Sequence, residues 1–298
     1  MWVQVPLRGQ IKFKTMYNKR KVIATTSTIP SRMDNLHFSI KSILGQSIKP
    51  DEIVVALPSH SMREEKDYEI HEEIKAMSDS GVITLLHSEE DHGPATKLFP
   101  VLKREMEAGL SKDKESIIIT FDDDKHYQRN AFENLLSSGA IECGAVACRK
   151  GSRIYLASED HPFYTAKNDG ILERIYNGGD EESLTRVDCL YGTSAVAYRA
   201  SYFDQDVFDY SSVDEDFPEV SAFFVDDIYL SGYLGTKGKT IVVCPFEKTA
   251  FQEKAPSNVT DGNTVNNAIN PVSDVSKKTP NLSKDVINYF SKVFHNKV

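Results

Sequence analysis

Short runs of β-branched and apolar residues alternate with segments of helical periodicity over the first half of the chain. Four such runs predict buried strands, at residues 21–27, 52–58, 82–88 and 116–121. Three intervening segments have the pattern of helices, at residues 31–45, 62–78 and 95–108. Strand–helix–strand units in series favour a parallel sheet with helices on its faces, which is an α/β fold. In such sheets ligands bind beyond the carboxyl ends of the strands.

The second half of the chain has a looser pattern. Further strands are predicted at residues 144–149, 186–199 and 239–245, with a helix at 223–235. A polar stretch at 252–281 predicts a linker, and the apolar stripe after it a C-terminal amphipathic helix. We expect that helix to pack on its own domain, with peripheral contact at a membrane as the alternative. The expected organisation is a lead-in (1–20), one domain (21–250) and a tail (251–298).

Composition and charge exclude several classes of function. The 298 residues are 40% hydrophobic and 27% charged, which suits a globular protein. A net charge of −9 without a dense Lys/Arg run argues against a nucleic-acid partner. No apolar stretch has the length of a transmembrane span, and the N-terminus lacks the apolar core of a signal peptide. The four cysteines have no paired spacing, so we interpret them as reduced, buried thiols of a cytoplasmic protein.

Three consecutive aspartates, Asp122, Asp123 and Asp124, follow the apolar run at 117–121 directly. Like charges side by side repel, so either water solvates them in a turn or a cation lies between them. Alternate side chains of an extended backbone face the same way, which lets Asp122 and Asp124 converge on one ion. Carboxylates suit Mg²⁺ or Mn²⁺, and either ion also binds diphosphate. The place of the triplet at a strand end favours the metal over the solvated turn.

Two further groups of charged residues are candidates for chemistry. Asp226 and Asp227 open the predicted helix at 223–235. Acids are common at helix N-termini, and this pair alone favours that interpretation over a general base. Asp91 and Lys97 flank a Gly-Pro turn in "DHGPATKL". A lysine near a helix N-terminus can bind phosphate, although an ordinary surface lysine is the simpler interpretation.

The remaining candidates are weaker. Thr25, Thr26 and Arg32 in "TTSTIPSR" place hydroxyls and a guanidinium at the end of the first strand, but many loops are rich in Ser and Thr. His92 and His126 each neighbour an acidic site and are candidate metal ligands. A lone histidine is usually only a polar surface residue.

Taken in order, these pieces resemble a nucleotide-sugar glycosyltransferase of the GT-A fold, close to the family 2 type. The resemblance covers residues 21 to 247. The segment "VIATTSTIPSRMDNLHFSIKSILGQSIKPDEIVVALP" is similar to the first strand, helix and second strand of that family, and "FDDD" resembles its DXD motif. "LYGTSAVAYRASYF" resembles the strand behind the acceptor site, and "VDDIYLSGYL" the acidic-pair helix. "DHGPATKL" is similar to a subset from bacteria and large viruses.

The resemblance implies a GT-A domain, a mostly parallel sheet flanked by helices with a smaller acceptor-side sheet and a C-terminal helical tail. It implies metal-dependent transfer of a sugar, with inversion, from a nucleotide-sugar to a hydroxyl of a glycan or other acceptor. The expected donor is a UDP-sugar and the expected cofactor Mn²⁺ or Mg²⁺. The metal neutralises charge on the leaving diphosphate, and a carboxylate takes the proton of the attacking hydroxyl.

The roles of single residues also follow from the resemblance. It implies that Asp124 binds the metal directly, with Asp122 near the metal or the ribose, and that Asp227 is the base, with Asp226 as the alternative. The residues implied on the nucleotide side are Thr25, Thr26, Arg32, Asp91, Lys97, Asp122 and Asp123. Asp123 is otherwise structural.

The sequence departs from the family in three places. The acidic pair is usually Glu-Asp and here is Asp-Asp. A third metal ligand is not evident, which leaves His126 or a shell of phosphate and water. An aromatic residue expected on the acceptor side after the pair is also not evident, although Tyr229 and Tyr233 lie near.

Two other functions compete with a transferase. A haloacid-dehalogenase-like Mg²⁺-dependent phosphatase also places Asp-x-Asp after an apolar strand. It needs Thr or Val two residues beyond the second aspartate, where Lys125 and His126 follow here. A non-catalytic sugar-binding relative of the fold is the third alternative.

Overall fold

The computed structural model describes residues 20–109, 111, 114–156, 170–176, 183–209, 226–245 and 260–261. The predicted lead-in, except Arg20, and the predicted C-terminal helix lie outside these residues. So does most of the predicted linker; its described part, Thr260–Asp261 (β15), pairs with Lys125–His126 (β7).

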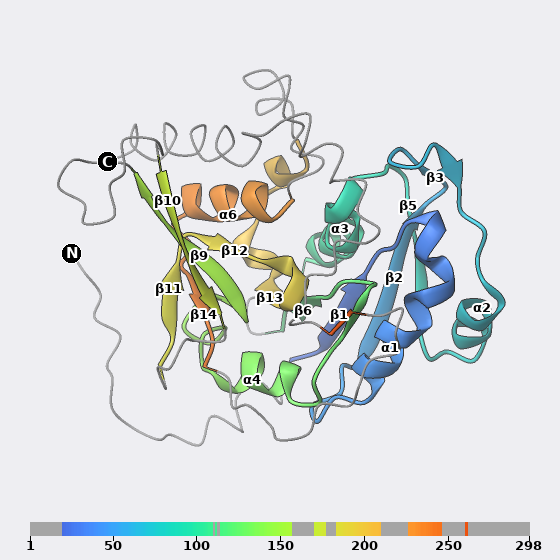
Figure 1. Cartoon of the computed structure of the whole chain (residues 1–298), viewed down its shortest axis with the longest axis horizontal. Helices are drawn as coiled ribbons and strands as arrows, with labels where there is room; N and C mark the ends of the chain where they lie inside the picture. Colours follow the sequence, from blue (N-terminus) through green and yellow to red (C-terminus); the bar gives the residue numbers. More distant parts are fainter. Residues whose placement is uncertain are drawn as a thin grey trace.

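An eight-stranded mixed sheet forms the centre of the molecule (Figure 1). Its strands lie in the order β11-β14-β8-β13-β6-β1-β2-β5. In that order their bounds are Thr185–Val187, Ile241–Val243, Val146–Cys148, Val196–Arg199, Ile117–Thr120, Val22–Thr26, Glu52–Pro58 and Thr84–Ser88. Strands β6, β1, β2 and β5 are parallel to their neighbours within that group, whereas β13 is antiparallel to both β6 and β8. The predicted α/β class with a mostly parallel sheet is confirmed.

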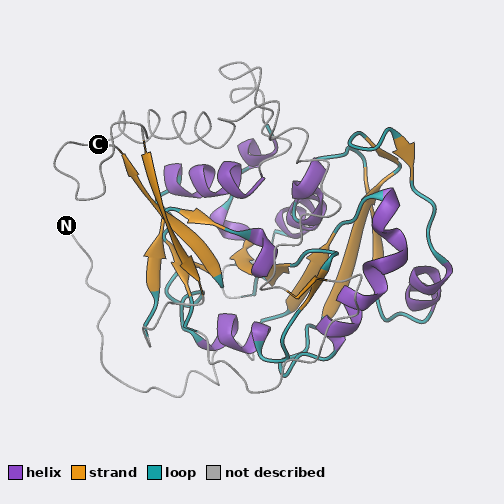
Figure 2. Cartoon of the chain, viewed as in Figure 1, coloured by secondary structure: helices purple, strands orange, loops and turns teal. Residues whose placement is uncertain are grey.

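Helices cover both faces of this sheet (Figure 2). The described α-helices are α1 (Leu36–Leu44), α2 (Glu72–Asp79), α3 (Phe99–Glu107), α4 (Ala131–Ser137) and α6 (Asp226–Thr236). Short 3-10 helices precede three of the elements that build the site, namely η3 (Pro30–Asn35), η4 (Gly93–Lys97) and η5 (Gly192–Ser194). A smaller sheet, β10-β9-β12, comprises Gly170–Tyr176, Lys150–Leu156 and Cys189–Leu190.

Two hydrophobic clusters show which helices pack on which face. Ile23 of β1 and Ile118 of β6 belong to the cluster that contains residues of α3 and α6. The next residue of β1, Ala24, belongs with Ile119 to the cluster built around α1 and α4. Successive strand residues thus face opposite sides, and both sides are covered, as in buried parallel strands.

The segment at 62–78 was predicted as one helix, and this prediction is wrong. Two short strands, β3 (His60–Ser61) and β4 (Lys66–Asp67), form a hairpin there, and α2 begins only at Glu72. Glu65 has φ of 52°, a left-handed conformation that interrupts a helix and reverses the chain. The imidazole of His71 accepts the backbone N–H of Glu73 and caps the later start.

Other departures concern the second half of the chain. The predicted strand at 186–199 is divided into the end of β11, β12, η5 and β13. Helix α4 and the β9–β10 hairpin were not predicted. Of the four cysteines, Cys143 is exposed, so the expectation of buried thiols holds for Cys148, Cys189 and Cys244.

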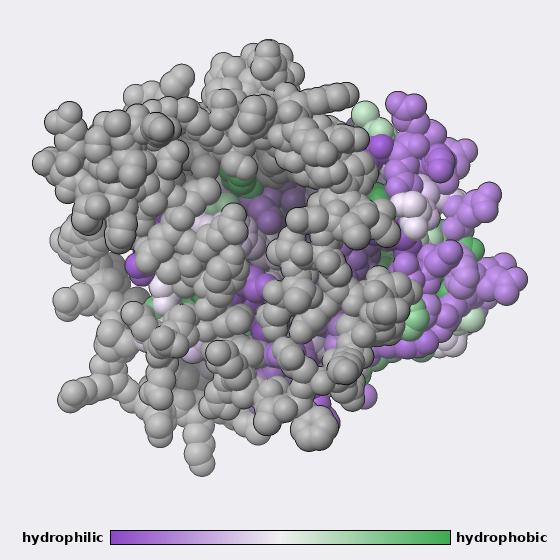
Figure 3. Space-filling model, in the orientation of Figure 1, coloured by the Kyte–Doolittle hydropathy of each residue, from purple (hydrophilic) through white to green (hydrophobic). Residues whose placement is uncertain are grey.

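The face of the molecule over α2 is hydrophilic (Figure 3). Its exposed side chains include Glu72, Lys75 and Asp79. Within the described part of the chain, no helix is both long enough and apolar enough to cross a membrane.

Candidate active site

The candidate residues meet at one edge of the central sheet. Strands β1 and β6 are parallel neighbours, with Thr25 opposite Thr120, so their carboxyl ends lie together. The aspartate triplet directly follows β6. Strand β13 runs the other way, which brings its beginning, Val196, opposite Thr120. The turn η5 before β13 therefore reaches the same edge as the triplet.

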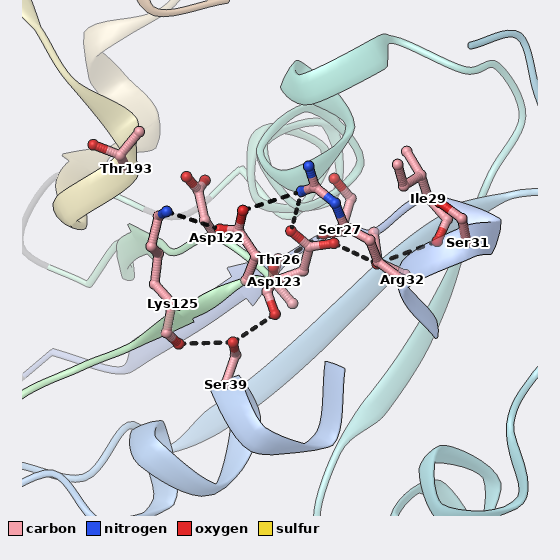
Figure 4. Close-up of polar contacts among 12 residues, drawn as sticks. Thr26, Ser27, Ile29, Ser31, Arg32, Ser39, Asp122, Asp123, Lys125 and Thr193 are labelled. Carbon is pink, nitrogen blue, oxygen red and sulfur yellow. Dashed lines mark hydrogen bonds and ion pairs between the residues drawn. The ribbon is translucent and has the colours of Figure 1, made fainter. Parts of the chain in front are cut away.

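The triplet is paired with cations of the chain itself (Figure 4). Arg32 approaches from one side, with Nη1 3.1 Å from Asp123 Oδ1 and 3.4 Å from Asp124 Oδ2. Lys125 approaches from the other, with Nζ 3.4 Å from Asp124 Oδ1. The side chain of Asp124 is 35% exposed and that of Asp123 only 8%. Asp124 is thus the acid of these two that a bound ion can reach.

Asp123 has a structural environment. Its carboxylate accepts the hydroxyl of Thr28, and its backbone oxygen accepts the hydroxyl of Ser39 at 2.6 Å. The same Ser39 hydroxyl reaches the carbonyl of Lys125 at 2.7 Å. Burial raises the pKa of Asp123, although the positive charge of Arg32 opposes this shift. These contacts fix the turn that carries the other two acids.

Asp122 belongs to a second group of charged residues. It pairs with Lys97, whereas Arg32 pairs with Asp123 and Asp124. Lys97 Nζ lies 3.0 Å from Asp122 Oδ1 and 3.2 Å from Asp226 Oδ2. The Lys97 side chain is 10% exposed. The hydroxyl of Thr25 donates to the Lys97 carbonyl at 2.7 Å, so the end of β1 holds the lysine backbone.

Asp227 lies against the turn η5. The Gly192 N–H donates to Asp227 Oδ1 at 2.9 Å. A Cβ on Gly192 would lie 2.7 Å from that oxygen and 3.1 Å from Lys97 Nζ, so only glycine permits this approach. Ser231, one turn later in α6, donates to the Asp227 carbonyl at 2.5 Å and accepts the Leu190 N–H at 3.0 Å. The start of α6 is therefore tied to β12 and η5.

The pKa values in this cluster are strongly perturbed. Burial, together with the charge of Asp226, raises the pKa of Asp227 from 3.8 to about 8. Burial lowers the pKa of Lys97. The negative charges of Asp122, Asp226 and Asp227 outweigh this effect and hold the lysine pKa well above its usual value. Burial likewise disfavours ionised Asp122, yet Lys97 keeps its pKa below the usual value. Perturbed pKa values at the end of a parallel sheet are typical of functional sites.

Seven of the predicted site residues lie in these two groups, namely Arg32, Lys97, Asp122, Asp123, Asp124, Asp226 and Asp227. Thr25 joins them through the Lys97 backbone, and both Thr25 and Thr26 are fully buried. Asp91 makes different contacts: its carboxylate accepts the N–H groups of Gly93 and Met62, each at 2.8 Å. It shapes the loop between β5 and η4.

His92 and the two tyrosines singled out in the sequence have structural neighbours, whereas His126 lies in β7, opposite Asp261 of β15. The His92 ring meets Phe99 edge-on at 5.1 Å, and burial lowers its pKa. The hydroxyl of Tyr229 donates to the Val207 carbonyl at 3.0 Å, and Tyr233 is also buried in the core.

The sequence analysis missed three residues of the site. Gly192 accommodates Asp227, Lys125 pairs with Asp124, and the buried Tyr127 hydroxyl accepts the Asp122 N–H at 2.8 Å. Lys125 directly follows the triplet and Tyr127 comes two residues later, so their nearness in sequence was an available signal. Gly192 had a weaker signal, a glycine inside an apolar strand pattern.

At this edge of the sheet, the described residues could provide a divalent ion with one or two carboxylate ligands. Among the residues that the structure describes, no three His, Cys, Asp or Glu side chains converge as ligands. Asp122 and Asp124 each face different cations of the chain. Mg²⁺ commonly binds through one or two carboxylates together with substrate phosphates and water, and partly exposed Asp124 matches that ligand set.

No protein-family model matches the chain. No curated protein matches it either. Among solved structures it is similar to 4-diphosphocytidyl-2C-methyl-D-erythritol synthase, with 11% identity over 62% of this chain and 75% of that one and a TM-score of 0.36. A second is TarS of S. aureus, with 11% identity, 77% and 35% coverage and a TM-score of 0.42.

A third is glucosyl-3-phosphoglycerate synthase from Mycobacterium tuberculosis, solved with Mn²⁺, UDP and glucosyl-3-phosphoglycerate. It has 15% identity over 50% of each chain and a TM-score of 0.30. The present chain spans about a third of TarS and half of the glucosyl-3-phosphoglycerate synthase. Likeness at this level carries no inference about activity, so the function is inferred from the chemistry of the site.

Proposed function

We propose that the protein is a glycosyltransferase that moves a sugar from a nucleotide-sugar, with UDP-sugar as the expected donor, to a hydroxyl acceptor. One observation carries the proposal: Lys97, Asp122, Asp226 and Asp227 form a charged, largely buried cluster from three distant segments at the carboxyl edge of the sheet. Such clusters stabilise a fold poorly because desolvation offsets their attraction. A binding or catalytic role explains why the chain keeps one.

The donor side of the proposed site is the face of the triplet that Arg32 and Lys125 approach. Both cations lie near the exposed oxygens of Asp124, where a diphosphate would gain charge-assisted hydrogen bonds. We propose that Asp124, with Asp122 beside it, holds Mn²⁺ or Mg²⁺ together with donor phosphates. When bound, such an ion supplies Lewis-acid neutralisation of the leaving diphosphate.

The acceptor side is the start of α6. We propose Asp227 as the general base, because its Oδ1 is oriented by the Gly192 N–H, whereas Asp226 is paired with Lys97. Ionised Asp227 would take the proton of the acceptor hydroxyl while that oxygen bonds to the anomeric carbon. The bond from that carbon to the diphosphate breaks at the same time, and its electron pair leaves with the phosphate. Attack opposite the leaving group inverts the configuration.

Calorimetric titration of the full chain with UDP, with and without Mn²⁺, tests this proposal. We expect UDP to bind more tightly with Mn²⁺, and Asp124→Asn to remove the metal-dependent part. Asp79→Asn, a change to an exposed residue of α2, should leave binding unaltered. If intact protein binds neither UDP nor Mn²⁺, the transferase proposal fails.

Activity assays separate the transferase from its rivals. Release of phosphate from p-nitrophenyl phosphate, with an acyl-phosphate trapped on Asp122, would identify a phosphatase instead. UDP binding without transfer or hydrolysis of any UDP-sugar would identify a non-catalytic binding protein. A cytoplasmic location, expected from the sequence, remains part of the proposal.

A further inference from the structure

Lys97 is held both at its backbone and at the end of its side chain. Its backbone oxygen accepts the hydroxyl of Thr25, and its ammonium lies between carboxylates of the triplet and of α6. Three chain segments that are distant in sequence therefore meet at one Nζ atom. An ordinary surface lysine has neither this burial nor two such partners.

The surroundings of the Lys97 ammonium leave little room for another ligand. A Cβ on Gly192 would lie 3.1 Å from Nζ, so backbone closes one side of the ammonium. Asp226 depends on the same ammonium: its Oδ2 is buried and makes no hydrogen bond with the described residues, and its ion pair with Lys97 Nζ is 3.2 Å long. Removal of the Lys97 charge would leave the buried carboxylate of Asp226 without the cation that compensates it.

The electrostatics make Lys97 a connection between the two halves of the site. Its Nζ lies 3.0 Å from an oxygen of Asp122 and 3.2 Å from an oxygen of Asp226, so one ammonium pairs with a carboxylate of each motif. Two buried carboxylates such as Asp122 and Asp226 repel each other unless a cation lies between them. The ammonium therefore favours an arrangement in which the start of α6 stays beside the triplet.

We propose that Lys97 is a positioning residue that couples the donor-side triplet to the acid pair of α6, and that it is not a ligand of the donor phosphates. It fixes Asp226 by direct ion pairing and thereby Asp227, the next residue of the helix. The catalytic consequence rests on the proposed function, whereas the coupling between Lys97 and Asp226 does not. Arginine is not equivalent, because its planar guanidinium would replace the compact ammonium that lies between Asp122 and Asp226.

The test compares Lys97→Met, Asp226→Asn and the double variant in the full chain. Methionine keeps an unbranched side chain of similar length without the charge. Lys103→Met is the control, since Lys103 of α3 is 53% exposed and pairs with Glu89 at the surface. The readouts are thermal unfolding, the affinity for UDP with Mn²⁺, and kcat and KM for transfer.

We expect Lys97→Met to lower the Tm by about 10 °C, because it leaves buried acids uncompensated. The double variant should regain at least half of that loss, so the two substitutions are not additive. UDP affinity should change less than about threefold in both variants, while kcat falls about 100-fold, since a displaced base impairs only the chemical step. The control should match the unaltered protein.

Two results would overturn the proposal. A tenfold or larger loss of UDP affinity in Lys97→Met would make Lys97 a phosphate ligand, as the sequence resemblance implies. Additive changes of Tm would show that the ammonium does not couple the two motifs. If the unaltered protein binds no UDP, the proposed function fails, and the Tm comparison still decides the coupling.

Discussion

Asp227 should make the stability of the protein depend on pH in a defined window. Its pKa is raised to about 8 in the folded protein from an ordinary value of 3.8. Between these values the folded protein retains a proton that the unfolded chain has released. The free energy of unfolding therefore falls as pH rises through this range, and the loss is complete above the folded pKa.

The magnitude follows from the size of the shift. Each tenfold change in the acid constant corresponds to about 1.4 kcal/mol, which sets an upper limit of about 6 kcal/mol. Coupling to Asp226 and Lys97 reduces the realised value, so we expect about 3 kcal/mol. Asp227→Asn removes this cost while its amide oxygen still accepts the Gly192 N–H. The variant should equal the unaltered protein at about pH 4 and exceed it by about 3 kcal/mol at about pH 9.

Urea unfolding followed at several pH values between these limits provides the assay. Asp79→Asn, on the exposed end of α2, is the matched control and should differ from the unaltered protein by a constant amount. A stability difference for Asp227→Asn that does not change with pH would refute the reasoning. The same proton governs catalysis: kcat/KM should rise with pH and level off above about 8 if Asp227 is the base.

Two other substitutions test single contacts of the site. Gly192→Ala should cost about 1–3 kcal/mol in urea unfolding, because its Cβ would lie 2.7 Å from Asp227 Oδ1; an unchanged midpoint would show that the turn moves freely. Arg32→Ala should cost about 3 kcal/mol, because it leaves buried Asp123 without its ion-pair partner. Arg32→Lys should avoid only part of that loss, since one ammonium cannot pair with both Asp123 and Asp124 as the guanidinium does; stability equal to the unaltered protein would contradict this.

The first half of the fold could be predicted because its pattern is local. Strand β2 has the predicted bounds, and β1, β5 and β6 lie within the predicted runs. Buried parallel strands consist of nearly continuous apolar residues, which a sequence displays directly. The error at 62–78 arose because this charged segment was expected to be one helix, whereas Glu65 adopts a left-handed conformation that no periodicity reveals.

The acidic residues of the site could be predicted from the sequence, but the ion pairs that connect them could not. Asp122 and Asp226 were recognised as separate motifs, and charges at strand and helix ends gave the signal. Nothing in the sequence indicates that Lys97 bridges them, because Asp122 lies 25 positions and Asp226 129 positions after the lysine, and only the folded sheet brings them together. Gly192 was missed for the same reason, since its requirement comes from a side chain 35 positions away.

The reversed direction of β13 has a consequence for the order in which the site assembles during synthesis. Within the described part of the chain, strands β1, β2, β5 and β6 pair with one another and, at β6, with β13, so the four strands form a continuous parallel block within residues 22–120. Strand β13 then adds to the free side of β6, across 76 residues of sequence between Thr120 and Val196. Contacts between residues so far apart in sequence form late in folding, because the chain must first lose the entropy of closing a long loop before the contacts can stabilise it. A nascent chain would therefore expose the aspartate triplet well before α6 emerges, and would gain its acid pair only once the ribosome has passed residue 227.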